Sequence, residues 1–242
     1  MSLNMTLRDI VEGLDGPRAK PEGLRRVAVA GEFGSGKSST INAILRDAVL
    51  PSDPGLPGRP LVKLSFGERA QIVAEDRAGR GMQLDAVAEL MPRGPLAWCD
   101  IRLPLPLLRG IELVEVPSGP AGGLAPADLQ LVAESDMLIW VTIGSQAWRL
   151  SEKTIVEALP AAIRARSVLA VSRADKLRAG SDFDKIELRL QHEASPFFNE
   201  LVFMQASQDN LRNAREQRIW QRTGGAELAN VVLDMAADAR AA

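Results

Sequence analysis

The sequence predicts an α/β protein with a mostly parallel sheet and helices on both faces, and two observations support this prediction. Short apolar runs alternate with stretches of helical spacing along most of the chain, which is typical of successive strand–helix units. The first unit also carries a glycine-rich loop, residues 31–38, between its strand and its helix. The sequence shows no internal repeat and no second domain, so we expect a single domain over residues 1–242.

The glycine-rich loop has a glycine, four free positions and then Gly-Lys-Ser, which is the spacing of a phosphate-binding P-loop. An apolar run, residues 27–30, precedes the loop, and residues 41–45 follow it with helical spacing. Glycines let several backbone N–H groups point at phosphate oxygens, and the following helix adds its unpaired N–H groups and the positive end of its dipole. A chance glycine-rich turn is the alternative, but such a turn would not require these two flanks.

We therefore expect the loop to bind the phosphates of a nucleotide. Lys37 supplies a mobile positive charge to the outer phosphates, and the hydroxyl of Ser38 is suited to ligate Mg2+. These two residues are the candidate catalytic residues. The candidate nucleotide-binding residues of this segment are Gly31, Glu32, Phe33, Gly34, Ser35, Gly36, Lys37, Ser38 and Ser39.

The elements around the loop follow from periodicity and from helix breakers. Apolar residues recur at helical spacing over residues 3–14, and glycines and a proline then end this N-terminal helix. Residues 24–30 form the first expected strand and residues 36–46 the next helix. Prolines recur at every third position over residues 51–60, which is typical of a stiff, extended surface loop. A docking peptide for a partner is the alternative interpretation of that loop.

The middle of the chain is expected to be rich in strands. Residues 61–66 and 70–75 read as strands, and a turn follows at 78–81. Residues 85–91 can form a short helix, which Pro92 ends. Two further strands, over residues 98–103 and 111–116, flank a Leu-Pro-rich stretch.

Strands and helices alternate through the last half of the chain. The strands are expected over residues 136–143, 167–172 and 201–206, and the first two are apolar enough to be covered on both faces. The helices are expected over residues 126–134, 151–159, 182–192, 208–222 and 226–239. Gly224 and Gly225 divide the last two, so residues 208–239 close the domain as two helices.

Composition and charge restrict the function. A net charge of −2 provides no overall field that would attract nucleic acid or an anionic membrane, so we expect no nucleic-acid partner. The single cysteine, Cys99, excludes an internal disulfide and suits a reducing cytoplasm. No apolar run approaches the roughly 20 residues that span a bilayer, and the N-terminus lacks the pattern of a signal peptide. We therefore expect a cytoplasmic protein without an integral membrane segment.

A second candidate nucleotide-binding segment, Ser172-Arg173-Ala174-Asp175, lies at the end of the strand expected over 167–172. P-loop GTPases place Asn/Thr-Lys-x-Asp at this point. A carboxylate there can accept hydrogen bonds from N1–H and the 2-amino group of guanine, whereas adenine offers no such pair of donors. We assign this role to Asp175, with the stem of Arg173 against the base or ribose and Ser172 bracing the P-loop. A surface aspartate after a strand is the alternative.

A third segment, Ala206 and Ser207, follows the next strand. GTPases often carry a Ser-Ala-like turn here, whose backbone contacts the guanine carbonyl. We include both residues among the candidate nucleotide-binding residues.

The segments that act on the γ-phosphate are altered. Glu115 ends an apolar strand where P-loop GTPases carry a metal-associated aspartate, and Ser118 stands where a glycine N–H would meet the γ-phosphate. We expect Glu115 to reach Mg2+ through a water molecule, because glutamate is one methylene longer. No threonine occurs between Thr40 and Thr142, so the residue that would hold the attacking water is missing.

The residues quoted so far resemble a known family. The P-loop with its following helix, residues 31–51, and the Leu-Pro-rich strand pair, residues 101–114, are similar to bacterial dynamin-like GTPases. Residues 136–141 and 172–175 fall in that family's order and spacing, so the resemblance covers roughly residues 24–207. It implies a Ras-like P-loop GTPase fold with extra antiparallel strands, GTP or GDP and Mg2+ as ligands, and a homodimer formed by pairing of G domains across the nucleotide.

The departures from the family's pattern concern hydrolysis more than binding. The family's switch I threonines fall at Gly58 and Arg59, and the P-loop serine that helps to hold a charge-compensating cation falls at Gly34. The Asp-Thr-Pro-Gly of switch II corresponds to residues 115–118, Glu-Val-Pro-Ser. We interpret Arg59 as a solvated loop residue rather than as a catalytic arginine finger.

Three functions remain open at this point. The first is a slow or partner-dependent GTP hydrolase that acts as a nucleotide switch, with Lys37, Ser38 and Mg2+ supplying positioning and charge. The second is a catalytically impaired pseudo-GTPase that binds guanine nucleotide and an unknown protein partner. The third is an ATP-using P-loop protein, which Asp175 disfavours.

Overall fold

The structure, a computed structural model, describes residues 20, 22–51, 59–87, 96–119, 123–177 and 181–241. Three predicted features lie wholly or partly outside these residues. They are the helix over residues 3–14, positions 52–58 of the proline-rich loop, and positions 88–91 of the short helix expected over 85–91.

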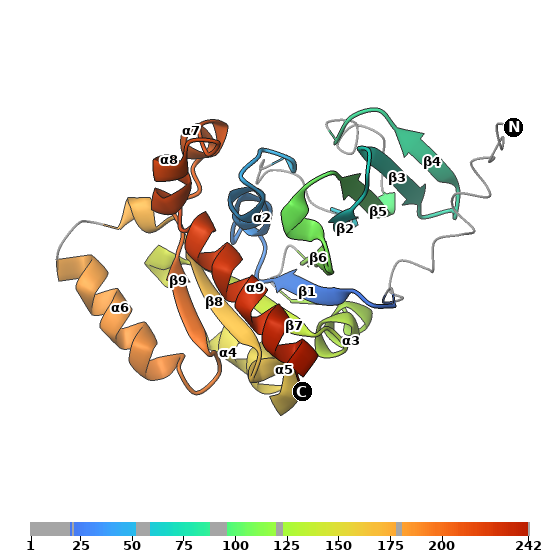
Figure 1. The fold of residues 1–242 in the computed structure, drawn as a ribbon. Helices are drawn as coiled ribbons and strands as arrows, with labels where there is room; N and C mark the ends of the chain where they lie inside the picture. Colours follow the sequence, from blue (N-terminus) through green and yellow to red (C-terminus); the bar gives the residue numbers. More distant parts are fainter. Residues whose placement is uncertain are drawn as a thin grey trace, which may run out of the picture.

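A nine-stranded sheet runs through the described residues, in the order β4-β3-β5-β2-β6-β1-β7-β8-β9 (Figure 1). The strands are β1 (Arg25–Ala30), β2 (Leu61–Phe66), β3 (Gln71–Asp76), β4 (Gly81–Leu84), β5 (Leu96–Leu103), β6 (Ile111–Glu115), β7 (Met137–Ile143), β8 (Ser167–Ser172) and β9 (Glu200–Phe203).

The sheet combines a parallel half with a mixed half. Strands β6, β1, β7, β8 and β9 are all parallel to their neighbours within this half. In the other half, β2 is antiparallel to β6 and parallel to β5, while β3 is antiparallel to both β5 and β4. The predicted fold class, an α/β fold with a mostly parallel sheet and extra antiparallel strands, is therefore confirmed.

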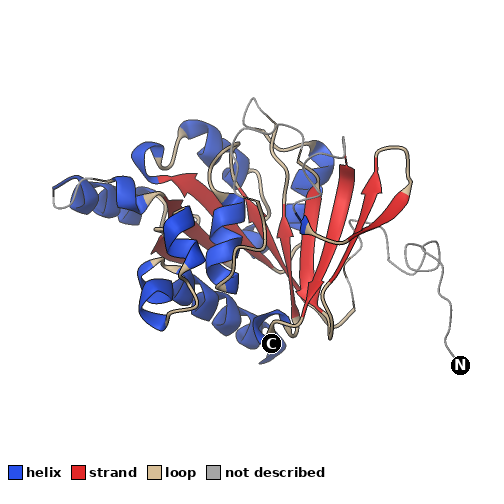
Figure 2. Cartoon of the chain, turned by 90° about the horizontal axis from the view of Figure 1, so that it is seen from above, coloured by secondary structure: helices blue, strands red, loops and turns tan. Residues whose placement is uncertain are grey.

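Helices cover both faces of the sheet (Figure 2). They are α2 (Lys37–Leu45), α3 (Pro126–Ala133), α4 (Leu150–Glu157), α5 (Ala161–Arg164), α6 (Ser181–Glu193), α7 (Gln208–Arg212), α8 (Gln217–Arg222) and α9 (Gly225–Ala241). One apolar core lies between the sheet and α2 and α9, where Ile44 and Leu228 are buried. The second core lies on the opposite face under α3, α4, α5 and α6, where Leu131 and Leu190 are buried.

The prediction of one helix over residues 208–222 is wrong, because α7 ends at Arg212 and α8 begins at Gln217. The carbonyls of the intervening segment bond to a side chain instead of continuing a helix. The guanidinium of Arg46 lies 3.4 Å from the carbonyl oxygen of Ala214 and 2.6 Å from that of Arg215. This tertiary contact leaves no local signal in the segment itself.

Two other boundaries differ from the prediction. The last strand was expected over 201–206 but ends at Phe203, because the backbone N–H of Gln205 then bonds to the carbonyl of Thr223. Strand β4 was not expected. It pairs with β3 at the edge of the sheet, beyond the turn predicted at 78–81, and its four residues are too few and too mixed in polarity to give a strand pattern.

Helix α9 lies directly on the P-loop helix α2. The preceding helix α8 also contacts α2: the indole N–H of its Trp220 donates a hydrogen bond to the carbonyl oxygen of Ala43 at 2.8 Å, and the guanidinium of Arg46 lies 4.5 Å from the centroid of the same ring. A Cβ atom on Gly225 would stand 2.3 Å from the Ala43 oxygen. The first turn of α9 therefore approaches α2 at backbone distance, and only glycine fits at this position.

We predict that Gly225→Ala destabilises the domain by about 1–3 kcal/mol, because the added methyl forces α9 away from α2. Urea unfolding followed by circular dichroism measures this difference. Gly123→Ala is the matched control, since a Cβ atom there meets nothing within 4 Å. Equal stability of the two variants would contradict the close approach.

Candidate nucleotide-binding site

The carboxyl ends of the parallel strands surround a cavity of about 280 Å³. Strand β1 lies between β6 and β7, so the connections that leave β1 and β6 go to opposite faces of the sheet, and ligands of open α/β sheets bind at such a point. The residues that line the cavity are Phe33, Gly34, Ser35, Gly36, Lys37, Ser38, Ser39, Thr40, Arg59, Pro60, Glu115, Pro117, Ser118, Ser172, Arg173, Asp175, Lys176, Ala206, Ser207 and Gln208.

The P-loop turns tightly beneath the end of β7. Gly31 has φ +148°, and a Cβ atom there would stand 2.2 Å from the carbonyl oxygen of Val141, so a side chain cannot be accommodated. Helix α2 then begins at Lys37, with Gly36 as its N-cap residue. Because the first N–H groups of a helix have no intrahelical partner, the start of α2 directs donors and the positive end of its dipole at the cavity.

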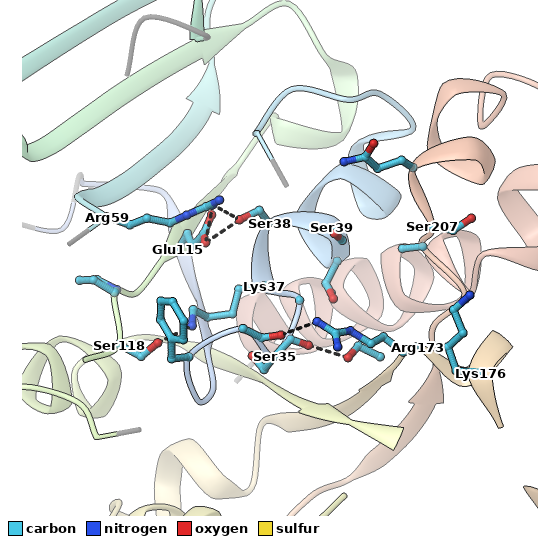
Figure 3. A pocket seen from close by; sticks show the side chains of 18 of the residues that line it. Ser35, Lys37, Ser38, Ser39, Arg59, Glu115, Ser118, Arg173, Lys176 and Ser207 are labelled. Carbon is cyan, nitrogen blue, oxygen red and sulfur yellow. Dashed lines mark hydrogen bonds and ion pairs between the residues drawn. The ribbon is translucent and has the colours of Figure 1, made fainter. Parts of the chain in front are cut away.

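Lys37 is held by three neutral oxygen atoms. Its ammonium donates hydrogen bonds to the carbonyl oxygens of Gly31 at 3.0 Å and Glu32 at 3.2 Å. It also donates to the hydroxyl of Ser118 at 2.8 Å (Figure 3). Burial lowers the pKa of Lys37 to about 8; the Glu115 carboxylate opposes this shift and Arg59 adds to it. Among the described residues, its hydrogen-bond partners are all neutral, and a phosphate would provide an anionic one.

Ser38, Glu115 and Arg59 form a second polar group beside Lys37 (Figure 3). The Ser38 hydroxyl donates to Glu115 Oε1 at 2.8 Å, and Arg59 Nη1 donates to Ser38 Oγ at 2.6 Å. Arg59 Nη1 is also 3.8 Å from Glu115 Oε1, and its side chain is only 23% exposed. The interpretation of Arg59 as a solvated loop residue is therefore wrong.

The P-loop is braced from the end of β8. The Ser172 hydroxyl donates a hydrogen bond of 2.5 Å to the carbonyl oxygen of Ser35, and Arg173 Nη2 donates to the carbonyl oxygen of Gly34 at 3.0 Å. Ser172 thus contacts the P-loop directly, as its expected bracing role requires. The guanidinium of Arg173 also reaches the P-loop backbone, and the placement of its stem against the base or ribose stays a prediction.

The far end of the cavity is formed by the segments after β8 and β9. Asp175 lines it with a side chain that is 25% exposed, and its nearest cation is Lys176 at 3.6 Å. Ala206 and Ser207 line the same end, and the Ser207 hydroxyl accepts the N–H of Asn210 at 3.3 Å as the cap of α7. The phosphate-binding and base-binding segments of the prediction therefore meet in one cavity.

Two predicted residues lie outside this lining. Gly31 contributes only its carbonyl, to Lys37. The carboxylate of Glu32 is directed to the start of α4, where it accepts hydrogen bonds from Arg149 Nη1 at 2.8 Å and from the Ser151 hydroxyl at 2.6 Å.

The lining also includes seven residues outside the predicted set, namely Thr40, Arg59, Pro60, Pro117, Ser118, Lys176 and Gln208. Pro117 and Ser118 belong to the altered segment that follows Glu115. Thr40, Lys176 and Gln208 each directly follow a predicted residue along the chain. Arg59 and Pro60 enter from a distant segment, through the pairing of β2 with β6. The sequence predicts the strand over 61–66 but not its pairing with β6, and this pairing is what brings Arg59 and Pro60 to the cavity.

Comparisons with known proteins agree with this geometry. Residues 27–89 match the model of the dynamin family. Two solved structures described as an oligomerised bacterial dynamin pair, with a mechanism for long-range sensing and tethering of membranes, share the fold. One has a TM-score of 0.64 and 17% identity, and the match covers 94% of this chain and 40% of that chain. The other has a TM-score of 0.61 and 18% identity, and covers 89% of this chain and 35% of that chain. No curated protein matches.

The P-loop at the end of β1 lies in a fold that this chain shares with the two bacterial dynamin structures, so the class of fold is that of the P-loop GTPases. The family-model match over residues 27–89 and the two structures point to the dynamin family in particular, which is similar to this chain in the P-loop segment and in the fold. The family implies guanine-nucleotide binding, usually with Mg2+, and its G domains generally hydrolyse GTP. The chain spans 35 to 40% of the length of the two matched structures. None of the described helices has the length and apolar character needed to span a membrane.

The side chains expected to hold Mg2+ do not fit the ion as they lie. Mg2+ takes oxygen ligands at about 2.0–2.1 Å in near-octahedral geometry. The Ser38 hydroxyl donates its proton to Glu115 and accepts from Arg59, whose nitrogen is already 2.6 Å from this oxygen. Within the described ranges, no three His, Cys, Asp or Glu side chains gather into a metal site. An ion bound directly to Ser38 would meet the guanidinium of Arg59.

We predict that Ser172→Ala weakens GDP binding about fivefold to tenfold, because loss of one buried hydrogen bond of about 1 kcal/mol loosens the P-loop. Fluorescence titration with a labelled GDP measures the change. Ser145→Ala, an exposed serine outside the cavity, is the control and should bind as the wild type does. An unchanged dissociation constant for Ser172→Ala would show that the brace is not needed.

Proposed function

We propose that this chain is a guanine-nucleotide-binding switch that hydrolyses GTP slowly or with the help of a partner. One observation carries the proposal: a single cavity is lined by the P-loop at one end and by Asp175 at the other. The two ends are joined by Ser172 and Arg173, whose hydrogen bonds to the P-loop carbonyls fix the phosphate-binding segment relative to the base-binding segment.

The phosphate end is prepared for an anion. Lys37 is positively charged, and its three contacts are with neutral oxygens that phosphate oxygens can replace. The hydroxyls of Ser35 and Thr40 are buried and have no hydrogen-bond partner within the described part of the chain. Buried polar atoms are rarely left in this state, so these hydroxyls support a site that is completed by a ligand.

The base end favours guanine over adenine. The Asp175 carboxylate offers two acceptor oxygens, which match the N1–H and 2-amino donors of guanine. Adenine has an acceptor at N1 and no amino group at C2, so a carboxylate there gains nothing from it. This contrast supports GTP and GDP as the ligands and disfavours the ATP-using alternative.

Hydrolysis is expected to be slow because the groups that act on the γ-phosphate are altered. Phosphoryl transfer depends on positioning of the water and on charge stabilisation, and loss of one such group typically costs several kcal/mol. In this chain Ser118 binds Lys37 through its hydroxyl, and no threonine occurs between Thr40 and Thr142 to hold the water. The same features favour the second candidate function, a pseudo-GTPase that binds nucleotide and a protein partner without turnover.

We also propose that two copies of this domain pair across the nucleotide. The matched bacterial dynamins are described as an oligomerised pair. In this chain Phe33 of the P-loop is 36% exposed and lines the nucleotide cavity, so an apolar side chain stands at the surface where a second domain would contact the first.

We predict that Asp175→Asn weakens GDP binding at least about tenfold while ADP binding stays unchanged, because the amide can accept only one of the two guanine donors. Parallel titrations with fluorescent GDP and ADP test this. Xanthosine diphosphate is the control for correct folding, since the amide of the Asp175→Asn variant can donate to the C2 carbonyl of xanthine. The variant should therefore bind this nucleotide more tightly than the wild type does. Equal affinity of the wild type for GDP and ADP would remove the assignment of Asp175 to guanine.

We predict a GTP turnover rate on the order of 10⁻³ s⁻¹ or slower for the isolated chain, comparable to a GTPase without its activating partner. Phosphate release at several protein concentrations measures the rate, and pairing across the nucleotide predicts that the rate per molecule rises with concentration. Lys37→Ala should remove the activity. Turnover at tens per second would contradict the proposed loss of the water-holding group, and complete absence of turnover would favour the pseudo-GTPase.

A further inference from the structure

The Arg59 guanidinium lies in the part of the cavity where a Mg2+-dependent site would hold the ion. Arg59 Nη1 lies 2.6 Å from Ser38 Oγ and 3.8 Å from Glu115 Oε1, the two oxygen atoms expected to hold or face the ion. We propose that the Arg59 guanidinium takes the place of Mg2+ beside the phosphates, so that this domain binds guanine nucleotide without a divalent cation. The inference rests on the proposed function, namely that this cavity binds GDP and GTP.

The strand register delivers Arg59 to this place. Strand β2 is antiparallel to β6, and Val62 is the partner of Glu115. Arg59 is three residues before Val62, so the chain that enters β2 passes over the end of β6, where Glu115 lies. Pro60 directly follows Arg59 and restricts it to an extended conformation, which limits the paths open to this residue. The contact is therefore built into the pairing of two central strands.

The charges in the cavity support the same conclusion. Glu115 and Ser38 are only 4% and 6% exposed, and a buried carboxylate requires a nearby cation. In a Mg2+-dependent site the ion helps to meet this requirement, whereas here Arg59 meets it before any ligand enters. Lys37 and Arg59 thus place two cations beside Glu115 at this end of the cavity.

A guanidinium is chemically suited to this role. It stays protonated at all pH values that proteins experience, and its planar fork of N–H donors matches phosphate oxygens. It also lacks the tightly held water shell that Mg2+ gives up reluctantly. Its charge is half that of the ion, so it can support binding of phosphates while stabilising the transition state of hydrolysis less well. Arg59 thus accounts for binding and for slow turnover together.

The test is the Mg2+ dependence of nucleotide affinity. Fluorescent GDP is titrated into the full chain in excess EDTA and again in millimolar Mg2+, for the wild type, Arg59→Ala and Arg80→Ala. Arg80 pairs with Asp76 on the β3–β4 hairpin and serves as the control for loss of one arginine. We expect the wild type and Arg80→Ala to change affinity less than about threefold between the two conditions.

Arg59→Ala should bind at least about tenfold more weakly than the wild type in EDTA and should recover more than about threefold on addition of Mg2+. A threefold or larger increase in the GDP affinity of the wild type on addition of Mg2+ would overturn the inference. The inference would also fail if the affinity of Arg59→Ala increased no more with Mg2+ than that of the wild type. If Arg59→Ala fails to fold, as judged by its melting curve, the wild-type ratio decides the matter alone. Absence of GDP binding to the wild type in both conditions would instead overturn the proposed function.

Discussion

The position of β1 between β6 and β7 determines where the functional side chains of this domain lie. The parallel strands β6, β1, β7, β8 and β9 bring their carboxyl ends to one edge, so the P-loop, Glu115 and Ser172 meet there although they are far apart in sequence. Strand β2 runs in the opposite direction beside β6, and therefore contributes the residues before its amino end. The cavity is thus assembled from the ends of parallel strands and from the beginning of one antiparallel strand.

The P-loop, Ser172 and Asp175 could be predicted as lining of one cavity because their signals are local. Residues 31–38 carry their spacing within one loop, and Ser172 and Asp175 lie at and just after the end of an apolar strand. Arg59 was misinterpreted because its place depends on the direction of β2, which no pattern within residues 51–66 reveals. The division of α7 from α8 was missed for a similar reason, since the carbonyls of that segment bond to Arg46 of a distant element.

The cavity is built partly from backbone groups and partly from side chains. Lys37 and the braced P-loop carbonyls depend on backbone geometry, which Ser172, Arg173 and Gly31 maintain. The groups around the γ-phosphate depend on particular side chains, and at these places the chain has Glu115 and Ser118. Backbone-based binding tolerates such substitutions because the N–H donors of the loop do not change with the side chains.

The close packing of α9 on α2 gives the domain a mechanical property. Helix α9 has 17 residues, which makes it a rod about 25 Å long. Its first turn approaches the backbone of α2 at Ala43, so the two helices have little room to move relative to each other. A tilt of α2 by about 5° would move the far end of such a rod by about 2 Å. A small rotation at the first turn of α9 would therefore become a larger displacement at its carboxyl end.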